Sequence, residues 1–99
     1  MKLYLDSSNN TKTVVGLKDK RWSFPMKKPR SQHLLKLIDQ VLKKEKLTLK
    51  EIKEIEVNLG PGSFTGLRVG VSVANALAWA LKIPINDGKI GELVEARYE

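Results

Sequence analysis

Alternating apolar and polar positions at the start of the chain predict three short strands in succession. Leu3 and Leu5 point to one face, and residues 13–17 form a second apolar run. Residues 22–26 then place Trp, Phe and Met at every second position. A period of two marks a strand with one buried face, and turn-forming residues separate the three runs, so we expect an antiparallel meander. Pro25 lacks a backbone donor, which favours the sheet edge for the third strand.

The pattern changes to a helical period in two later stretches. Residues 31–46 place five apolar side chains on one arc opposite several lysines, and Ser31 is the expected N-cap. Residues 55–59 alternate as a fourth strand, and a second helix is expected from about residue 63 to residue 81. Residues 83–85 then predict a short fifth strand at a sheet edge.

This order, β-β-β-α-β-α-β, predicts an α/β fold. With right-handed crossovers it gives a mixed five-stranded sheet in spatial order 3-2-1-4-5, and both main helices then lie on one face. The opposite face is left to the tail, residues 86–99. The apolar side chains with which this tail is expected to cover that face are Leu93, Val94, Ala96 and Tyr98.

The second helix is apolar around most of its circumference. Arg68, Ser72 and Asn75 form its only narrow polar stripe. Small residues recur at every fourth position and would let another backbone approach closely; they are Gly66, Gly70, Ala74 and Ala78. So much apolar surface predicts contact with a second protein. The alternative is that the first helix and the tail cover all of it.

The glycine-rich segment before this helix does not match the common nucleotide-binding motifs. It lacks the lysine of a P-loop, and its glycine spacing is one residue longer than that of the dinucleotide fingerprint. Two interpretations remain open. In one, the N–H groups near Ser63, Phe64 and Thr65 hold an anion beside Arg68. In the other, the glycines form a tight turn and Ser63 is the N-cap.

Composition excludes several classes of chemistry. The 99 residues predict one domain, and the absence of cysteine together with a single histidine, His33, excludes disulfides, thiolate zinc sites, cysteine nucleophiles and two-histidine metal motifs. We therefore expect no metal site. Because no stretch has the uninterrupted apolar length of a membrane span and no secretory segment begins the chain, we expect a cytoplasmic protein that does not enter membranes.

The net charge of +7 is unevenly distributed. Residues 1–50 contain 13 Lys or Arg against 4 Asp or Glu, or +9, whereas residues 51–99 contain 5 against 7, or −2. Because the lysines come without interleaved aromatic residues on which bases could stack, the count favours lysines that improve solubility. The alternative is a basic surface for RNA or an acidic partner. The candidate RNA-binding residues are Lys27, Lys28, Arg30, Lys43 and Lys44.

Three stretches resemble one known family. The segment GPGSFTGLRVGVSVANALAWALKIP resembles the signature of the bacterial TsaB (YeaZ) family, LYLDSS resembles its opening strand, and SQHLLKLIDQVL resembles its first helix. The resemblance covers residues 1–85 and implies an RNase H-like lobe of the actin/Hsp70/sugar-kinase superfamily. Since the family has two lobes, residues 1–99 are expected to form a single N-terminal-type lobe with the second lobe absent.

The resemblance also implies a function. The family supplies a non-catalytic subunit that binds and activates TsaD, which makes threonylcarbamoyladenosine in tRNA. We therefore expect a TsaD-like partner, a TsaE-like ATPase as a further partner, a homodimer when the chain is alone, and only weak or indirect contact with tRNA. The implied partner interface consists of Leu34, Leu37, Ile38, Val41, Ser63, Phe64, Thr65, Gly66, Leu67, Arg68, Gly70, Val71, Ala74 and Ala78.

Nucleotide binding is the enzymatic alternative. Asp6 matches the superfamily's first phosphate-loop aspartate, and with Ser7 it would form a vestigial phosphate loop. A degenerate ATPase would use these residues and the loop 60–66. Because nucleotide in this superfamily lies between two lobes, we expect no ATP or magnesium cofactor.

The chain also departs from the family at Arg30, where a histidine usually stands, and at Lys36, where the family often has a proline.

Overall fold

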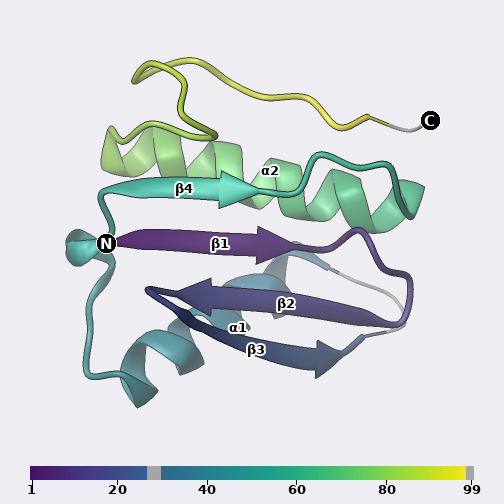
Figure 1. Cartoon of the computed structure of the whole chain (residues 1–99), viewed down its shortest axis with the longest axis horizontal. Helices are drawn as coiled ribbons and strands as arrows, with labels where there is room; N and C mark the ends of the chain where they lie inside the picture. The colour runs from purple at the N-terminus through teal and green to yellow at the C-terminus, as the bar shows by residue number, and fades with distance from the viewer. Residues whose placement is uncertain (27–29, 98–99) are drawn as a thin grey trace.

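The computed structural model describes residues 1–26 and 30–97, which form a mixed sheet with two helices (Figure 1). Four strands lie in the order β3-β2-β1-β4, with β2 antiparallel to both of its neighbours and β4 parallel to β1. The elements in chain order are β1 (Lys2–Asp6), β2 (Lys12–Leu17), β3 (Lys20–Pro25), α1 (Ser31–Lys44), the 3₁₀ turn η1 (Leu49–Glu51), β4 (Glu54–Val57) and α2 (Phe64–Leu81).

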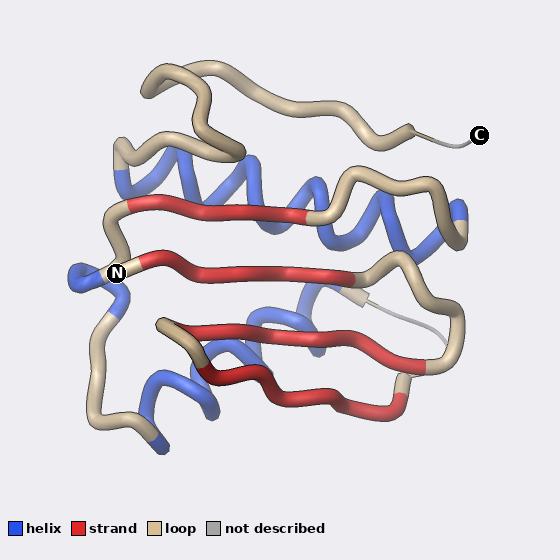
Figure 2. The backbone as a smooth tube through the Cα atoms, viewed as in Figure 1, coloured by secondary structure: helices blue, strands red, loops and turns tan. Residues whose placement is uncertain are grey.

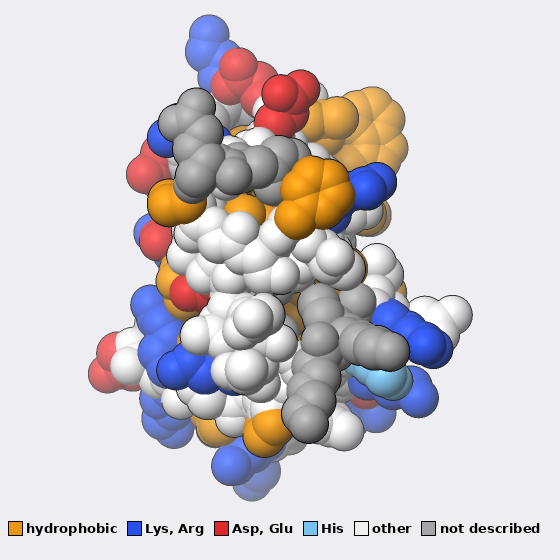
Figure 3. All heavy atoms as spheres, turned by 90° about the vertical axis from the view of Figure 1, so that its right-hand side faces the viewer, with side chains coloured by type: hydrophobic (Ala, Val, Ile, Leu, Met, Phe, Trp, Pro, Cys, Tyr) orange, Lys and Arg blue, Asp and Glu red, His pale blue; other side chains and the backbone are white. Residues whose placement is uncertain are grey.

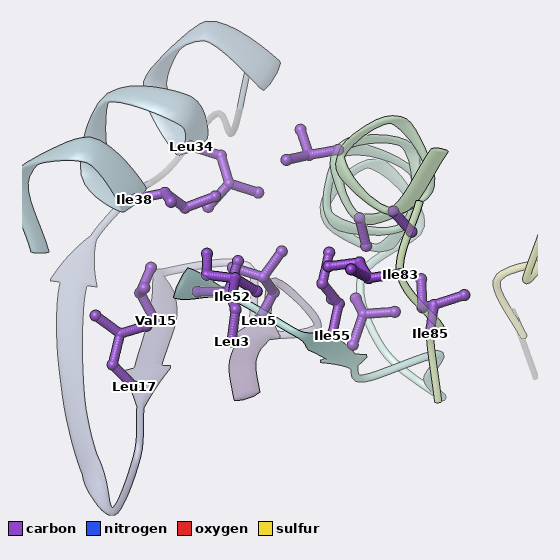
Figure 4. Close-up of a cluster of buried hydrophobic side chains, with 14 of the residues drawn as sticks. Leu3, Leu5, Val15, Leu17, Leu34, Ile38, Ile52, Ile55, Ile83 and Ile85 are labelled. Atoms are coloured by element: carbon purple, nitrogen blue, oxygen red, sulfur yellow. The ribbon is translucent and has the colours of Figure 1, made fainter. Parts of the chain in front are cut away.

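Both helices cover the same face of the sheet, as the right-handed crossovers predict (Figure 4). Leu3 and Leu5 of β1 point into this layer and are fully buried, and Leu34 and Ile38 of α1 meet them from above. Trp22 of β3 lies opposite Val15 of β2 and packs against the same core. The period-two interpretation of the first three strands is therefore confirmed, and β3 lies at an edge of the sheet.

The predicted fifth strand is not formed. Ile85 makes only an isolated parallel bridge to Ile55 of β4. The next residue, Asn86, has a φ of 50° and turns its side chain onto the strand, where its amide accepts from Val57 N at 2.8 Å and donates to Val57 O at 3.0 Å. One side chain thus takes both hydrogen bonds that a continuing strand would make. The sheet has four strands because Asn86 ends the pairing.

The tail does not cover the opposite sheet face. The expectation that Leu93, Val94 and Ala96 cover that face is therefore wrong. From the end of α2 it turns back and runs along that helix (Figure 2). Asn75 of α2 donates to Val94 O at 2.9 Å and accepts from Val94 N at 3.0 Å, and Arg97 N donates to Leu59 O at 2.6 Å. Tyr98 lies outside the described residues.

The opposite sheet face is instead polar. Lys2 forms an ion pair with Glu56 at 3.1 Å, and the Arg21 guanidinium lies 4.4 Å from the centre of the Tyr4 ring. The Arg21 side chain lies over Gly16 on this face, and a Cβ on Gly16 would overlap it. Charged and hydrogen-bonding groups occupy this face, so it does not need an apolar cover.

The two helices begin differently. Ser63 caps α2 as predicted, with its side chain accepting from Gly66 N at 3.4 Å. The expected Ser31 cap of α1 is wrong: Arg30 holds the N-cap position, no side chain caps it, and Ser31 is the first helical residue. Among the described residues α2 is the one helix with the length and hydropathy of a membrane span, yet seven of its residues are buried in the core.

Candidate functional site

The loop after β1 and the glycine-rich loop after β4 are joined into one unit at the carboxyl ends of these parallel strands. Ser63 N donates to Ser8 O at 2.7 Å, and the buried Ser7 hydroxyl donates to Gly66 O at 2.6 Å. A Cβ on Gly62 would overlap Ser8, and one on Gly66 or Gly70 would overlap Ser7. The glycines are therefore required by close contact inside the chain, which favours the tight-turn interpretation over an anion cradle.

Asp6 is held within the same unit. Its carboxylate accepts from Ser8 N at 2.9 Å and from the Ser8 hydroxyl at 2.6 Å, and Tyr4 donates to it at 3.3 Å. Burial raises the pKa of Asp6, but the hydrogen bonds from Ser8, with further ones from Asn58 and Tyr4, bring the pKa below its ordinary value of 3.8. Asp6 and Ser7, the residues of the vestigial phosphate loop, are thus engaged in holding the loops together.

The small-residue track of α2 faces the chain's own core. Ala74 is 0% exposed and Ala78 is 5% exposed, and Gly66 and Gly70 lie under Ser7. Nine of the fourteen predicted interface residues are buried; they are Leu34, Ile38, Val41, Gly66, Leu67, Gly70, Val71, Ala74 and Ala78. Ser7, in the loop after β1, fills the space beside Gly66 and Gly70, so this part of the track is occupied from within the chain. Contact between α2 and a second protein stays a prediction, and the small residues named for it are buried.

The remaining five interface residues reach the surface. Phe64, Thr65 and Arg68 are exposed, and Ser63 and Leu37 are half-buried. Arg68 lies 5.5 Å from the centre of the Phe64 ring. The polar stripe of α2 thus marks its outward face, in the opposite direction from the small-residue track.

A hollow between the two helices, here called the helix groove, includes part of this outward face. It encloses about 300 Å³ and is lined by Ser31, Thr65, Arg68, Val69 and Ser72. Most of its lining side chains are small, so a helix laid along it can approach α2 closely. Sequence reasoning named four of these residues, all except Val69, but not the groove, which requires the contact between α1 and α2.

A second hollow lies on the other flank of α1, between this helix and the end of β3, and is here called the basic groove. It encloses about 720 Å³ and is lined by Pro25, Met26, Arg30, His33, Lys36, Leu37 and Gln40. Among the candidate RNA-binding residues that the structure describes, only Arg30 lines it. Lys43 pairs with Asp39 at 2.9 Å, Lys44 is exposed, and Lys27 and Lys28 lie outside the described residues.

An exposed apolar patch, missed at the level of sequence, lies where the tail meets the end of α2. Trp79, Ile90 and Leu93 are 71%, 65% and 64% exposed. Trp79 borders one hollow with Ile90 and another with Leu93. Only the return of the tail along α2 brings these side chains together.

The described residues contain no group of three His, Asp or Glu side chains placed to hold a metal ion. Within the same residues every buried side-chain nitrogen or oxygen has a hydrogen-bond partner. Their polar interior is therefore fully engaged in structure.

Comparison with known proteins identifies the family of this chain. Residues 26–87 match the family model described as "TsaD: tRNA N6-adenosine threonylcarbamoyltransferase". A solved structure described as "YeaZ from Pseudomonas aeruginosa" superposes with a TM-score of 0.73 at 26% identity, covering 89% of this chain and 43% of that one. The chain therefore belongs to the family that this model describes.

Its curated relatives identify the branch as TsaB (YeaZ). The tRNA threonylcarbamoyladenosine biosynthesis protein TsaB of Bacillus subtilis is 33% identical over 88 residues, which are 85% of this chain and 38% of the relative. TsaB of Buchnera aphidicola subsp. Schizaphis graminum is 41% identical over 59 residues, 60% of this chain and 28% of the relative. The chain thus spans well under half the length of these relatives.

Proposed function

We propose that this chain acts in the biosynthesis of threonylcarbamoyladenosine in tRNA as a non-catalytic subunit that binds a TsaD-like catalytic partner through the helix groove. Membership of the TsaB (YeaZ) family is the observation that carries this proposal, since the relatives are named for that pathway. The role needs no catalytic group on this chain and no nucleotide on Asp6 and Ser7.

The shape of the helix groove supports the choice of surface. The groove is lined by the small polar side chains of Ser31, Thr65 and Ser72 and by the apolar side chain of Val69. Arg68 offers a cation beside it. A partner helix with small or apolar residues and a carboxylate opposite Arg68 would fit, in a packing of helix ridges into grooves.

The test is a matched pair of arginine substitutions. Ser72→Arg places a long cation in the middle of the helix groove, whereas Ser23→Arg makes the same change on exposed β3. We expect Ser72→Arg to weaken binding to the TsaD-like subunit of the same organism at least about tenfold, or about 1.4 kcal/mol, in calorimetric titration. Ser23→Arg should leave the affinity unchanged.

The outcomes separate surface from function. If both variants bind as the unchanged chain does, the helix groove is not the interface. If the unchanged chain neither binds the TsaD-like subunit nor raises its threonylcarbamoyl transfer to tRNA, the proposed role itself fails. Unfolding curves of both variants check that neither substitution has disturbed the fold.

A further inference from the structure

The basic groove carries positive charge that no acidic side chain among its described lining residues neutralises. Arg30, His33 and Lys36 are exposed and recur every third residue, which places them on one flank of α1. The described residues that line the groove include no acidic side chain, and Asp39 on the same helix is paired with Lys43. The ion pairs found among the described residues involve neither Arg30 nor Lys36.

The backbone and the wider surface add to this charge. The positive end of the α1 dipole lies beside Arg30, the N-cap residue. The first turn contains no acidic residue to offset this charge, and the N-cap side chain makes no capping bond. In Figure 3, Lys and Arg side chains gather over the lower part of the molecule, where β2, β3 and α1 lie. The groove is thus the hollow part of the basic half of the chain.

We propose that the basic groove binds RNA directly through its phosphate backbone. Arg30 and Lys36 would pair with phosphates, His33 and Gln40 would supply hydrogen bonds, and Met26 and Leu37 would lie under the sugars. Within the described part of the chain the groove lining has no aromatic side chain on which bases could stack, so binding would be independent of sequence, with a dissociation constant of about 1 to 100 μM at physiological salt.

The choice of RNA rather than DNA rests on the proposed function, which acts on a tRNA. The basic groove and the helix groove occupy opposite flanks of α1. A partner bound in the helix groove therefore leaves the basic groove open. Binding to RNA can be measured on the chain alone, so failure of this inference and failure of the subunit role are distinguishable.

The experiment follows the fluorescence anisotropy of a labelled, unmodified tRNA transcript titrated with the chain at several salt concentrations. The test variant is Arg30→Gln with Lys36→Gln. The control, Lys82→Gln with Lys89→Gln, makes the same change of charge on two exposed lysines in the other half of the chain. Arg30→Lys with Lys36→Arg is a third variant that keeps both charges.

We expect the test variant to bind about tenfold more weakly, and the slope of log affinity against log salt to fall in magnitude by about 1.4 to 1.8, the value for two lost phosphate contacts. The control should lose less than half as much, and the charge-conserving variant should bind as the unchanged chain does. Equal losses in test and control would overturn the groove in favour of diffuse charge. No binding at 100 μM chain, or binding only to a DNA oligonucleotide of the same sequence, would overturn the proposal outright.

Discussion

At the scale of single residues, the glycines of α2 are explained by what touches them. Gly66 and Gly70 were predicted to receive a foreign backbone, and the spacing of small residues was correct. The neighbour that fills the space beside these glycines is Ser7, which comes from a loop 59 residues earlier than Gly66, and a helical period carries no information about such a contact. In the folded chain Gly66 and Gly70 lie in the joint between the loop after β1 and α2.

This joint can be tested by a double-mutant cycle at Ser7 and Gly70. The Cβ added by Gly70→Ala would overlap the Ser7 hydroxyl, and overpacking of this kind costs about 1 to 3 kcal/mol of the free energy of unfolding. Ser7→Ala alone removes the hydrogen bond to Gly66 O and should cost about 1 kcal/mol. The double variant removes the overlap with the hydroxyl and leaves the Cβ of position 7 at 3.1 Å, so its loss should be smaller than the sum of the two single losses by at least about 0.5 kcal/mol.

The measurement for this cycle is urea unfolding of the four proteins. Ala76→Gly at an exposed position of α2 provides the reference for helix propensity, with an expected loss of about 1 kcal/mol. Additive losses at Ser7 and Gly70 would contradict the close contact between them.

At the scale of elements, periodicity located the four strands and two α-helices of the described residues, and it failed where one side chain replaces a backbone. Residues 83–85 have the apolar alternation of a strand. Asn86 then ends the pairing, because its side-chain amide makes the two hydrogen bonds to Val57 that a strand backbone would make. Asn75 does the same for Val94 and fixes the path of the tail. Hydropathy counts both residues only as polar, so it predicted a fifth strand and a tail on the wrong face.

Asn86 should therefore control the edge of β4. We expect Asn86→Ala to lower the free energy of unfolding by about 2 to 3 kcal/mol, because two partly buried backbone groups of Val57 lose their partner. Asn86→Asp keeps the acceptor for Val57 N, so its free energy of unfolding should lie between that of the unchanged chain and that of Asn86→Ala. Hydrogen exchange at the Val57 amide should quicken in Asn86→Ala.

The control for the β4 edge is Asn10→Ala, a change at an exposed turn position that should cost less than about 0.5 kcal/mol. Unchanged exchange at Val57 in Asn86→Ala would mean that the strand edge does not depend on this side chain.

At the scale of the whole molecule, the division of charge was predictable from the sequence but the surfaces were not. Summing Lys and Arg against Asp and Glu placed the basic half correctly in residues 1–50. The two grooves that flank α1 depend on how this helix sits between α2 and β3. The same limit applies to the patch of Trp79, Ile90 and Leu93, which exists only because the tail reverses direction.

The net charge also sets how the chain should associate with itself. In the absence of a TsaD-like partner we expect a second copy to occupy the helix groove around a two-fold axis. Two chains that each carry +7 repel one another, and salt screens this repulsion, so the dimer should tighten between 50 and 500 mM NaCl. RNA binding should weaken over the same range, since phosphate contacts are lost to salt. Opposite salt dependences would thus separate the two events.

Sedimentation velocity measures this self-association directly, as a shift from the 11.1 kDa monomer to twice that mass. Ser72→Arg should hold the chain as a monomer at concentrations where the unchanged chain is a dimer, and Trp79→Ser should leave the dimer intact. If Trp79→Ser abolishes the dimer and Ser72→Arg does not, self-association belongs to the exposed apolar patch and the helix groove is left to the catalytic partner alone. A dimer that weakens as salt rises would contradict the repulsion argument, because attraction between the basic and acidic halves would then dominate.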